Sequence, residues 1–293
     1  MIPRGMPSPS AFSLMGIVNA TPDSFSDGGQ YLDRDAAIAQ GLAVVQQGAA
    51  IVDVGGESTR PGATPVSAAQ ECERVIGVIA GLAGAGIQAE ISVDTSKAQV
   101  AGPALAAGAG MVNDVTAFRA DPAMAGLVAD RGARCCLMHM LGQPRTMQRA
   151  PRYDHVVDDV RAFLEERLAF AVGEGIAEER ILLDPGIGFG KTVEHNLELL
   201  ARLDELVAIG RPVVIGTSRK GFLGRLTAGR SGVAPPPRER LPGTIATCVM
   251  ALERGASVFR VHDVAPVGDA LTVAAATLTG PWTARSTPTT PMT

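Results

Sequence analysis

Polar and charged residues recur in this sequence at the ends of short apolar runs, where they could form a binding site. Asp94, Asn113 and Asp184 each end or interrupt such a run. Cations gather in the same way in "TSRKG", residues 217–221, and in "RVHD", residues 260–263. Loops are polar in any protein, but a charge inside an apolar run is costly without a partner. We therefore interpret these positions as parts of one site.

The side chains of this predicted site fall into two chemical groups. Asp94, Asn113 and Asp184 supply hydrogen-bond acceptors and one amide, which a donor-rich heterocycle such as a 2-amino-pyrimidinone ring would satisfy. The cations suit an anionic group such as phosphate. They are Arg60, Arg219, Lys220, Arg260 and His262. The sequence therefore predicts a ligand with a donor-rich ring and a phosphate tail.

Eight apolar, β-rich runs alternate with stretches of helical periodicity. Strands are expected at residues 13–18, 50–55, 89–94, 110–115, 134–139, 180–184, 212–217 and 257–262. Helices are expected at residues 33–47, 66–82, 96–107, 155–173, 194–207, 242–254 and 265–278, with a weaker candidate at 121–131. This alternation favours a single-domain α/β fold, the (β/α)8 or TIM barrel, over an open doubly wound sheet. In a barrel the polar ends of all eight strands share one face.

Composition along the chain predicts where the barrel begins and ends. We expect it to span residues 13–279, between flexible tails at residues 1–12 and 280–293 that are rich in Pro, Ser and Thr. The segment "TAGRSGVAPPPRER", residues 227–240, is expected to be a surface loop, because three successive prolines do not fit a helix interior.

The glycine-rich stretch "DPGIGFGKT", residues 184–192, lies between a predicted strand and a predicted helix, as a nucleotide-phosphate loop would. That motif needs four residues between its first glycine and its Gly-Lys pair. Here only three separate Gly186 from Gly190, and Pro185 stands where the first glycine should be. We therefore expect the glycines to let backbone approach a flat ligand, with Phe189 as a pocket wall. Loss of an ATPase activity in Lys191→Ala would support the nucleotide alternative.

Overall composition restricts the classes of partner and the cellular compartment. A formal net charge of −4 and 4% aromatic residues argue against nucleic acid as the main partner. No apolar stretch approaches the length of a membrane span, and we see no signal peptide. The four cysteines show no C-x-x-C spacing, so we expect free thiols and a cytoplasmic location. They are Cys72, Cys135, Cys136 and Cys248.

Eight motifs, in order along the chain from about residue 13 to residue 278, resemble the dihydropteroate synthase family. They are "GIVNATPDSFSDGG", "DVGGESTRPGA", "SVDTSK", "NDVTAF", "MHMLGQPRTMQ", "DPGIGFGK", "TSRKGFLG" and "RVHDV". The resemblance implies a folate-pathway barrel that condenses 6-hydroxymethyl-7,8-dihydropterin diphosphate with 4-aminobenzoate. It also implies Mg²⁺, a homodimer and sensitivity to sulfonamides, which mimic 4-aminobenzoate.

The resemblance also assigns roles to the matching positions. It implies that the pterin is bound by Asp94, Asn113, Met138, Asp184 and Lys220. It implies that the diphosphate is bound by Asn19, Thr59, Arg60, Arg260 and His262, with Asn19 also on Mg²⁺. The aminobenzoate pocket would be formed by Phe25, Pro61, Phe189, Ser218 and Gly221. Catalysis would depend on Asp27, Arg60, Lys220, Arg260 and His262. The loops at 20–30 and 57–66 would close over the site.

Some positions and alternatives stay open at the level of sequence. Gly221 stands where many family members carry Ser or Arg, so the aminobenzoate or sulfonamide contacts could differ. Asp53, Glu57 and His139 lie beside the motifs without an assigned role. A pterin-binding methyltransferase would share the ring contacts but would need no diphosphate site, and the cations argue against it. A non-catalytic relative should have lost some of the matched residues, and here all are present.

Overall fold

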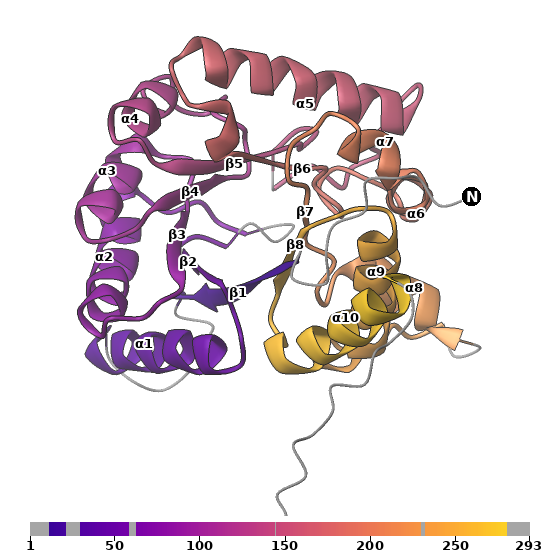
Figure 1. Ribbon diagram of the computed structural model, residues 1–293, viewed down its shortest axis with the longest axis horizontal. Coiled ribbons are helices and arrows are strands. Elements are labelled where there is room, and N and C mark those ends of the chain that lie inside the picture. Colours follow the sequence, from indigo (N-terminus) through magenta and orange to yellow (C-terminus); the bar gives the residue numbers. More distant parts are fainter. Residues whose placement is uncertain (1–11, 22–29, 59–62, 144, 230–231, 280–293) are drawn as a thin grey trace, which may run out of the picture.

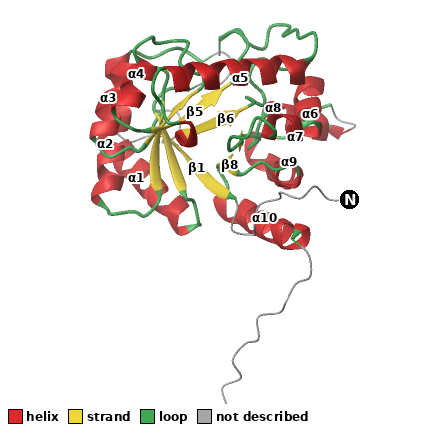
Figure 2. Ribbon diagram, turned by 45° about the horizontal axis from the view of Figure 1, so that its top comes forward, coloured by secondary structure: helices red, strands yellow, loops and turns green. Residues whose placement is uncertain are grey.

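The computed structural model describes residues 12–21, 30–58, 63–143, 145–229 and 232–279, without the side chains of residues 30–33. Its eight strands form the centre, and helices surround them (Figure 1; Figure 2). The strands are β1 (Ser13–Asn19), β2 (Ile51–Gly55), β3 (Glu90–Asp94), β4 (Met111–Asp114), β5 (Arg134–Met138), β6 (Ile181–Asp184), β7 (Val214–Ile215) and β8 (Val258–Val261). All eight expected strands are confirmed, with small differences at their ends.

The helices follow the strands in turn. They are α1 (Gln30–Gln46), α2 (Ala68–Gly84), α3 (Ala98–Ala106), α4 (Met124–Asp130), α5 (Val156–Gly173), α6 (Val193–Ala201), α7 (Leu203–Val207), α8 (Gly221–Thr227), α9 (Leu241–Glu253) and α10 (Val264–Leu278). The expected helix at 194–207 is interrupted at Arg202, whose φ of −112° and ψ of 29° are not helical. Helix α8 was not expected, because two glycines in seven residues weaken its helical pattern.

The strands pair in parallel in the order β6-β5-β4-β3-β2-β1-β8-β7. The ends of this sheet meet where the Leu183 amide donates to the Pro212 carbonyl over 3.0 Å and Leu183 bridges Val213. The sheet therefore closes on itself. This confirms the single-domain (β/α)8 barrel and excludes the open doubly wound alternative.

Strand alternation explains why the polar residues of different strands converge. One apolar layer fills the barrel interior. It comprises Met15, Ile51, Met111, Cys136, Leu182, Val214 and Val258. Side chains two positions apart on a strand point to the same side. The next inward positions on β2, β4, β6 and β8 are therefore Asp53, Asn113, Asp184 and Arg260, one layer closer to the carboxyl ends of the strands.

The four cysteines are free thiols in the structure, as expected. Burial raises the pKa of Cys135 to about 12 and that of Cys248 to about 11, so both stay protonated. In the described residues, no helix has the length and apolar character needed to cross a membrane. The expected tails lie outside the described residues, apart from Phe12, and their boundaries stay predictions. The loop at 227–240 contains a short 3-10 helix at Pro237–Arg240.

Candidate functional site

Arg260 occupies the centre of the barrel mouth and joins three strands. Its Nε donates to Asp53 Oδ2 over 2.6 Å, and its Nη2 donates to Asp94 Oδ2 over 2.7 Å. Burial alone would lower the pKa of Arg260, but the two carboxylates raise it above its usual value. The guanidinium is therefore charged and fixed in direction, and its Nη1 takes part in neither bond.

The three expected ring-binding side chains lie around this guanidinium. Asn113 Nδ2 donates to Asp53 Oδ2 over 3.0 Å, so Asp53 orients both Asn113 and Arg260. Burial raises the pKa of Asp94 to about 7 despite the neighbouring Arg260. Burial also raises the pKa of Asp184, and nearby Lys220 partly opposes this effect. Buried acceptors in one layer can bind a flat ring that donates several hydrogen bonds.

The segment after β7 brings two of the expected residues together and places one cation elsewhere. Ser218 Oγ lies 2.9 Å from His262 Nδ1 and accepts from the His262 amide over 3.2 Å. Arg219 Nε and Nη2 donate to the Asp263 carboxylate over 2.9 and 2.5 Å. Arg219 has a φ of +58°, which this ion pair helps to hold. This ion pair fits a structural role for Arg219 better than the expected role as a phosphate ligand.

Lys220 links this segment to the glycine-rich loop. Its Nζ donates to the Ile187 carbonyl and lies 4.2 Å from the centre of the Phe189 ring. Burial lowers the pKa of Lys220 to about 7. Phe189 packs on a small apolar cluster that includes Met138, Met140 and Met147. Lys220, Met138 and Phe189 thus lie together on one side of the site.

The glycines of the stretch at 184–192 pack closely against the segment after β5. Gly186, Gly188 and Gly190 have φ values of +67°, +83° and +61°. A β-carbon on Gly186 would overlap the His139 carbonyl, and one on Gly190 would overlap the Leu141 carbonyl. The glycines allow the loop to lie on the segment after β5, and the expectation that they also let backbone approach a flat ligand stays a prediction.

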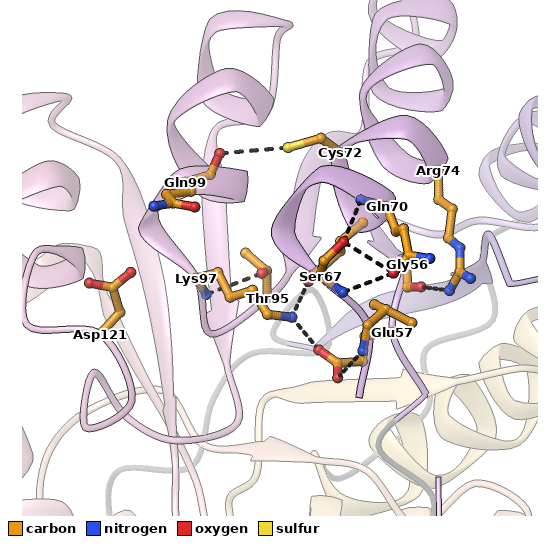
Figure 3. Close-up of polar contacts among 12 residues, drawn as sticks. Gly56, Glu57, Ser67, Gln70, Cys72, Arg74, Thr95, Lys97, Gln99 and Asp121 are labelled. Atoms are coloured by element: carbon orange, nitrogen blue, oxygen red, sulfur yellow. Dashed lines mark hydrogen bonds and ion pairs between the residues drawn. The ribbon is translucent and has the colours of Figure 1, made fainter. Parts of the chain in front are cut away.

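A second polar cluster lies beside the carboxyl ends of β2 and β3 (Figure 3). Lys97 Nζ bridges Glu57 Oε2 and the buried Glu71 Oε2, each at 2.5 Å. Glu57 Oε1 also accepts from the Val66 amide over 3.2 Å. Arg74 Nη1 donates to the Gly56 carbonyl over 2.7 Å. The Glu57 side chain therefore binds the Val66 backbone, which links the two ends of the loop after β2.

Several other open positions are explained by contacts within the protein. Asp114 accepts from the amides of Thr116 and Phe118 over 2.7 and 3.0 Å, which fixes the turn after β4. The His139 ring contacts Lys191, with Nδ1 2.9 Å from Lys191 Nζ. His195 forms a capping box with Thr192 at the start of α6. Among the positions that the sequence left without a role, Asp53 contacts the candidate site most directly. Strand alternation could have indicated it.

Known proteins with the same pattern identify the family. The family described as "Pterin binding enzyme" matches residues 15–262. Dihydropteroate synthase of Mycobacterium leprae (strain TN) is 49% identical over 267 residues, covering 90% of this chain and 93% of the relative. Xanthomonas albilineans dihydropteroate synthase, solved with 4-aminobenzoic acid, is 47% identical with a TM-score of 0.86, covering 93% of this chain and 95% of that one. This chain belongs to the dihydropteroate synthase family.

A dihydropteroate synthase of Yersinia pestis, solved in a sulfonamide drug complex, is similar over 96% of this chain and 99% of its own. It is 40% identical, with a TM-score of 0.86. Gly221, which we expect to differ from the residue in many family members, is exposed at the start of α8. No heavy atom lies within 4 Å of a β-carbon placed there, so the described structure has room for a side chain.

The family implies Mg²⁺, and Asn19 is the residue expected to bind it. Asn19 ends β1 in register with Gly55 of β2, which is in register with Asp94 of β3. Within the described ranges, no three His, Cys, Asp or Glu side chains are grouped to hold a metal ion. One amide oxygen suits a Mg²⁺ ion whose other ligands are diphosphate and water oxygens, as is common for this metal. The residues fit a metal that binds together with the substrate.

Five of the expected site residues lie outside the described residues. They are Phe25, Asp27, Thr59, Arg60 and Pro61. Their expected positions in the loops after β1 and β2 stay predictions. The described remainder brings together Asp94, Asn113, Asp184 and Arg260 in one cluster.

Proposed function

We propose that this protein is a dihydropteroate synthase that joins 6-hydroxymethyl-7,8-dihydropterin diphosphate to 4-aminobenzoate. The products are 7,8-dihydropteroate and diphosphate. The observation that carries the proposal is the layer of acceptors, Asp94, Asn113 and Asp184, around the fixed Arg260 cation in a barrel mouth. The similarity to the relatives from M. leprae, X. albilineans and Y. pestis supports the same function.

The pterin ring would bind through the buried acceptors. Asp94, Asn113 and Asp184 would accept from its amino and ring N–H groups, with Met138 against its face and Lys220 as a donor beside it. Arg260 would reach the diphosphate through Nη1, or by exchanging its hydrogen bond to Asp94 for one to the ligand. Because Asp53 already fixes Arg260 and Asn113, the site is arranged before the substrate arrives, which lowers the entropy lost on binding.

The diphosphate would extend toward Asn19, Arg260 and His262, with Thr59 and Arg60 from the loop after β2. When bound there, Mg²⁺ would neutralise the diphosphate and make it a better leaving group. The CH₂–O bond breaks, the electron pair leaves with the diphosphate, and the electron-rich ring stabilises the cation. The cations of this site favour the charge that develops on the departing oxygen.

The 4-aminobenzoate would bind on the side of Phe189, Ser218 and Gly221, with Phe25 and Pro61 from the loops after β1 and β2. Its amino nitrogen attacks the CH₂ carbon and then loses one proton, which forms the C–N bond of dihydropteroate. The reaction needs no protein nucleophile, so catalysis depends on placement and electrostatics. Closed loops would keep water from the cation, a role we propose for the loops that hold Asp27 and Arg60.

A homodimer is part of the proposal, and exposed apolar side chains on adjacent helices support it. Leu197 of α6, Leu226 of α8 and Met250 of α9 are 42%, 51% and 43% exposed. Helices α8 and α9 both contact α6, and the three lie on one side of the barrel (Figure 1). Apolar side chains gathered on one surface are typical of protein–protein contacts.

The function is tested by following radiolabelled 4-aminobenzoate into dihydropteroate. Purified protein with the dihydropterin diphosphate and Mg²⁺ should form labelled product, and EDTA or a sulfonamide should suppress it. Asp184→Asn should lose most activity, because a ring donor would meet an amide instead of a carboxylate. Tight pterin diphosphate binding without product would indicate a non-catalytic relative. Failure to bind either substrate would contradict the proposal.

A further inference from the structure

The loop between β6 and α6 is held by side chains to an unusual extent. Each of its five carbonyls from Gly186 to Gly190 accepts a hydrogen bond from a side chain. Lys220 binds that of Ile187, Gln148 that of Gly188 and Tyr153 that of Gly190. Lys191 binds the remaining two, so it makes more of these bonds than any of the other donors.

Lys191 is fully buried and has three partners in hydrogen-bond range. Its Nζ lies 3.0 Å from the Gly186 carbonyl, 3.1 Å from the Phe189 carbonyl and 2.9 Å from His139 Nδ1. As an ammonium, it would donate to all three. As a neutral amine, it would donate to the two carbonyls and accept from a protonated His139 Nδ1. Both states are therefore satisfied, with a different His139 tautomer for each.

Electrostatics favour neutral partners at this buried position. Burial lowers the pKa of Lys191 well below its usual value, although nearby Asp184 opposes the effect. Burial also lowers the pKa of His139 to about 2, and the adjacent Lys191 adds to this shift. His139 is therefore neutral at physiological pH and can serve as either donor or acceptor at Nδ1.

We propose that Lys191 and His139 form a positioning pair that fixes Phe189 and so shapes the 4-aminobenzoate side of the site. The carbonyls that Lys191 joins belong to Phe189 itself and to the residue three positions before it. His139 ties this unit to the end of β5, where the Gly186 backbone lies against the His139 carbonyl. The inference rests on the proposed function for the identity of the ligand, but the role of the pair in holding the loop does not.

Lys191→Met tests the pair, since methionine keeps the apolar stem and removes every donor. Arg134→Met is the matched control: it also removes a long cation from an ion pair, with Glu90 at 2.5 Å, but at the amino end of the barrel. Amide hydrogen exchange over residues 184–192 is measured first, without substrates. We expect at least about tenfold faster exchange in Lys191→Met than in the wild type and no change in Arg134→Met.

Steady-state kinetics then separate positioning from general damage. Lys191→Met should raise the KM for 4-aminobenzoate at least about fivefold and change that for the pterin diphosphate less than twofold. His139→Leu, which leaves the two carbonyl bonds in place, should show the same split with a smaller size, and it decides the matter if Lys191→Met does not fold. Unchanged loop exchange, or equal rises in both KM values, would overturn the pair. A wild type without product would refute the proposed function alone, because the exchange result still stands.

Discussion

Asp53 shows how much one buried carboxylate can determine at the scale of a residue. It is fully buried, and its Oδ2 accepts from both Arg260 and Asn113, whereas its Oδ1 has no partner in the described part of the chain. The proposed pterin contact Asn113 and the proposed diphosphate contact Arg260 therefore both depend on a residue that the sequence motifs left without a role. Its inward direction follows from Ile51, two positions earlier on β2.

Asp53→Asn should weaken both the fold and the site. Removing one partner of a buried ion pair leaves the other charge poorly compensated, which costs about 3 kcal/mol of unfolding free energy. Chemical denaturation should show this loss, and pterin affinity should fall at least about tenfold. Ser92→Ala is the control, because the buried Ser92 hydroxyl has no partner among the described residues and its removal should be nearly neutral. Wild-type affinity in Asp53→Asn would contradict the orienting role.

The affinity for 6-hydroxymethyl-7,8-dihydropterin should be greatest near pH 7. Burial raises the pKa of Asp94 to about 7, so at lower pH the carboxyl gains a proton and one acceptor is lost. Burial lowers the pKa of Lys220 to about 7, so at higher pH its positive charge is lost. Calorimetric titrations from pH 5.5 to pH 8.5 would reveal both limbs.

Two variants show which residue causes the fall in pterin affinity on each side of pH 7. Asp94→Asn cannot titrate, so it should bind more weakly and lack the fall on the acid side. Lys220→Met should lack the fall on the alkaline side. A profile that keeps both limbs in both variants would show that other groups, or the pterin itself, titrate in this range.

At the scale of elements, the β6–α6 loop is defined by its contact with the end of β5. Three glycines in left-handed conformations bring its backbone against His139, Leu141 and Lys220. Phe189 is presented from this loop, and Lys220 lies over its ring. The loop therefore acts as a rigid part of the scaffold, although its sequence resembles a flexible phosphate-binding segment.

Gly186→Ala should destabilise the protein by at least about 2 kcal/mol, because the new β-carbon would overlap the His139 carbonyl at a φ of +67°. Gly126→Ala is the control. It lies in α4 with no heavy atom within 4 Å of a new β-carbon, so it should be neutral or stabilising by up to about 1 kcal/mol. Thermal and denaturant unfolding measure both. Equal effects of the two substitutions would contradict this account of the loop.

Features that depend on residues close together in the sequence could be predicted, whereas features that depend on contacts between distant residues could not. Period-two alternation and short apolar runs are local, so the strands, the barrel and the convergence of Asp94, Asn113 and Asp184 could be predicted. The burial of Lys191 could not, because it arises from His139 and from the fold of the loop around it. The short helix α8 is likewise stabilised by packing of Phe222 and Leu223 into the core, against its glycine content.

At the scale of the whole molecule, the helices on one side of the barrel should form the proposed dimer contact. Met250→Asp would place a charge on that surface and should shift the mass measured by light scattering from twice 30.2 kDa toward 30.2 kDa. Val172→Asp on α5 is the control, since Val172 is 41% exposed and Met250 is 43% exposed. A dimer that resists Met250→Asp, or yields equally to both variants, would exclude this surface.

The bonds of Arg260 also bear on how the chain matures during synthesis. They connect β8 to Asp53 and Asp94, which lie 207 and 166 residues earlier. A ribosome makes the amino-terminal strands first, so both carboxylates emerge long before the guanidinium that neutralises them. Strand β8 also supplies the pairing between β1 and β7. Barrel closure and neutralisation of the pterin site are therefore completed by the same strand, and a nascent chain that stops before β8 should have neither.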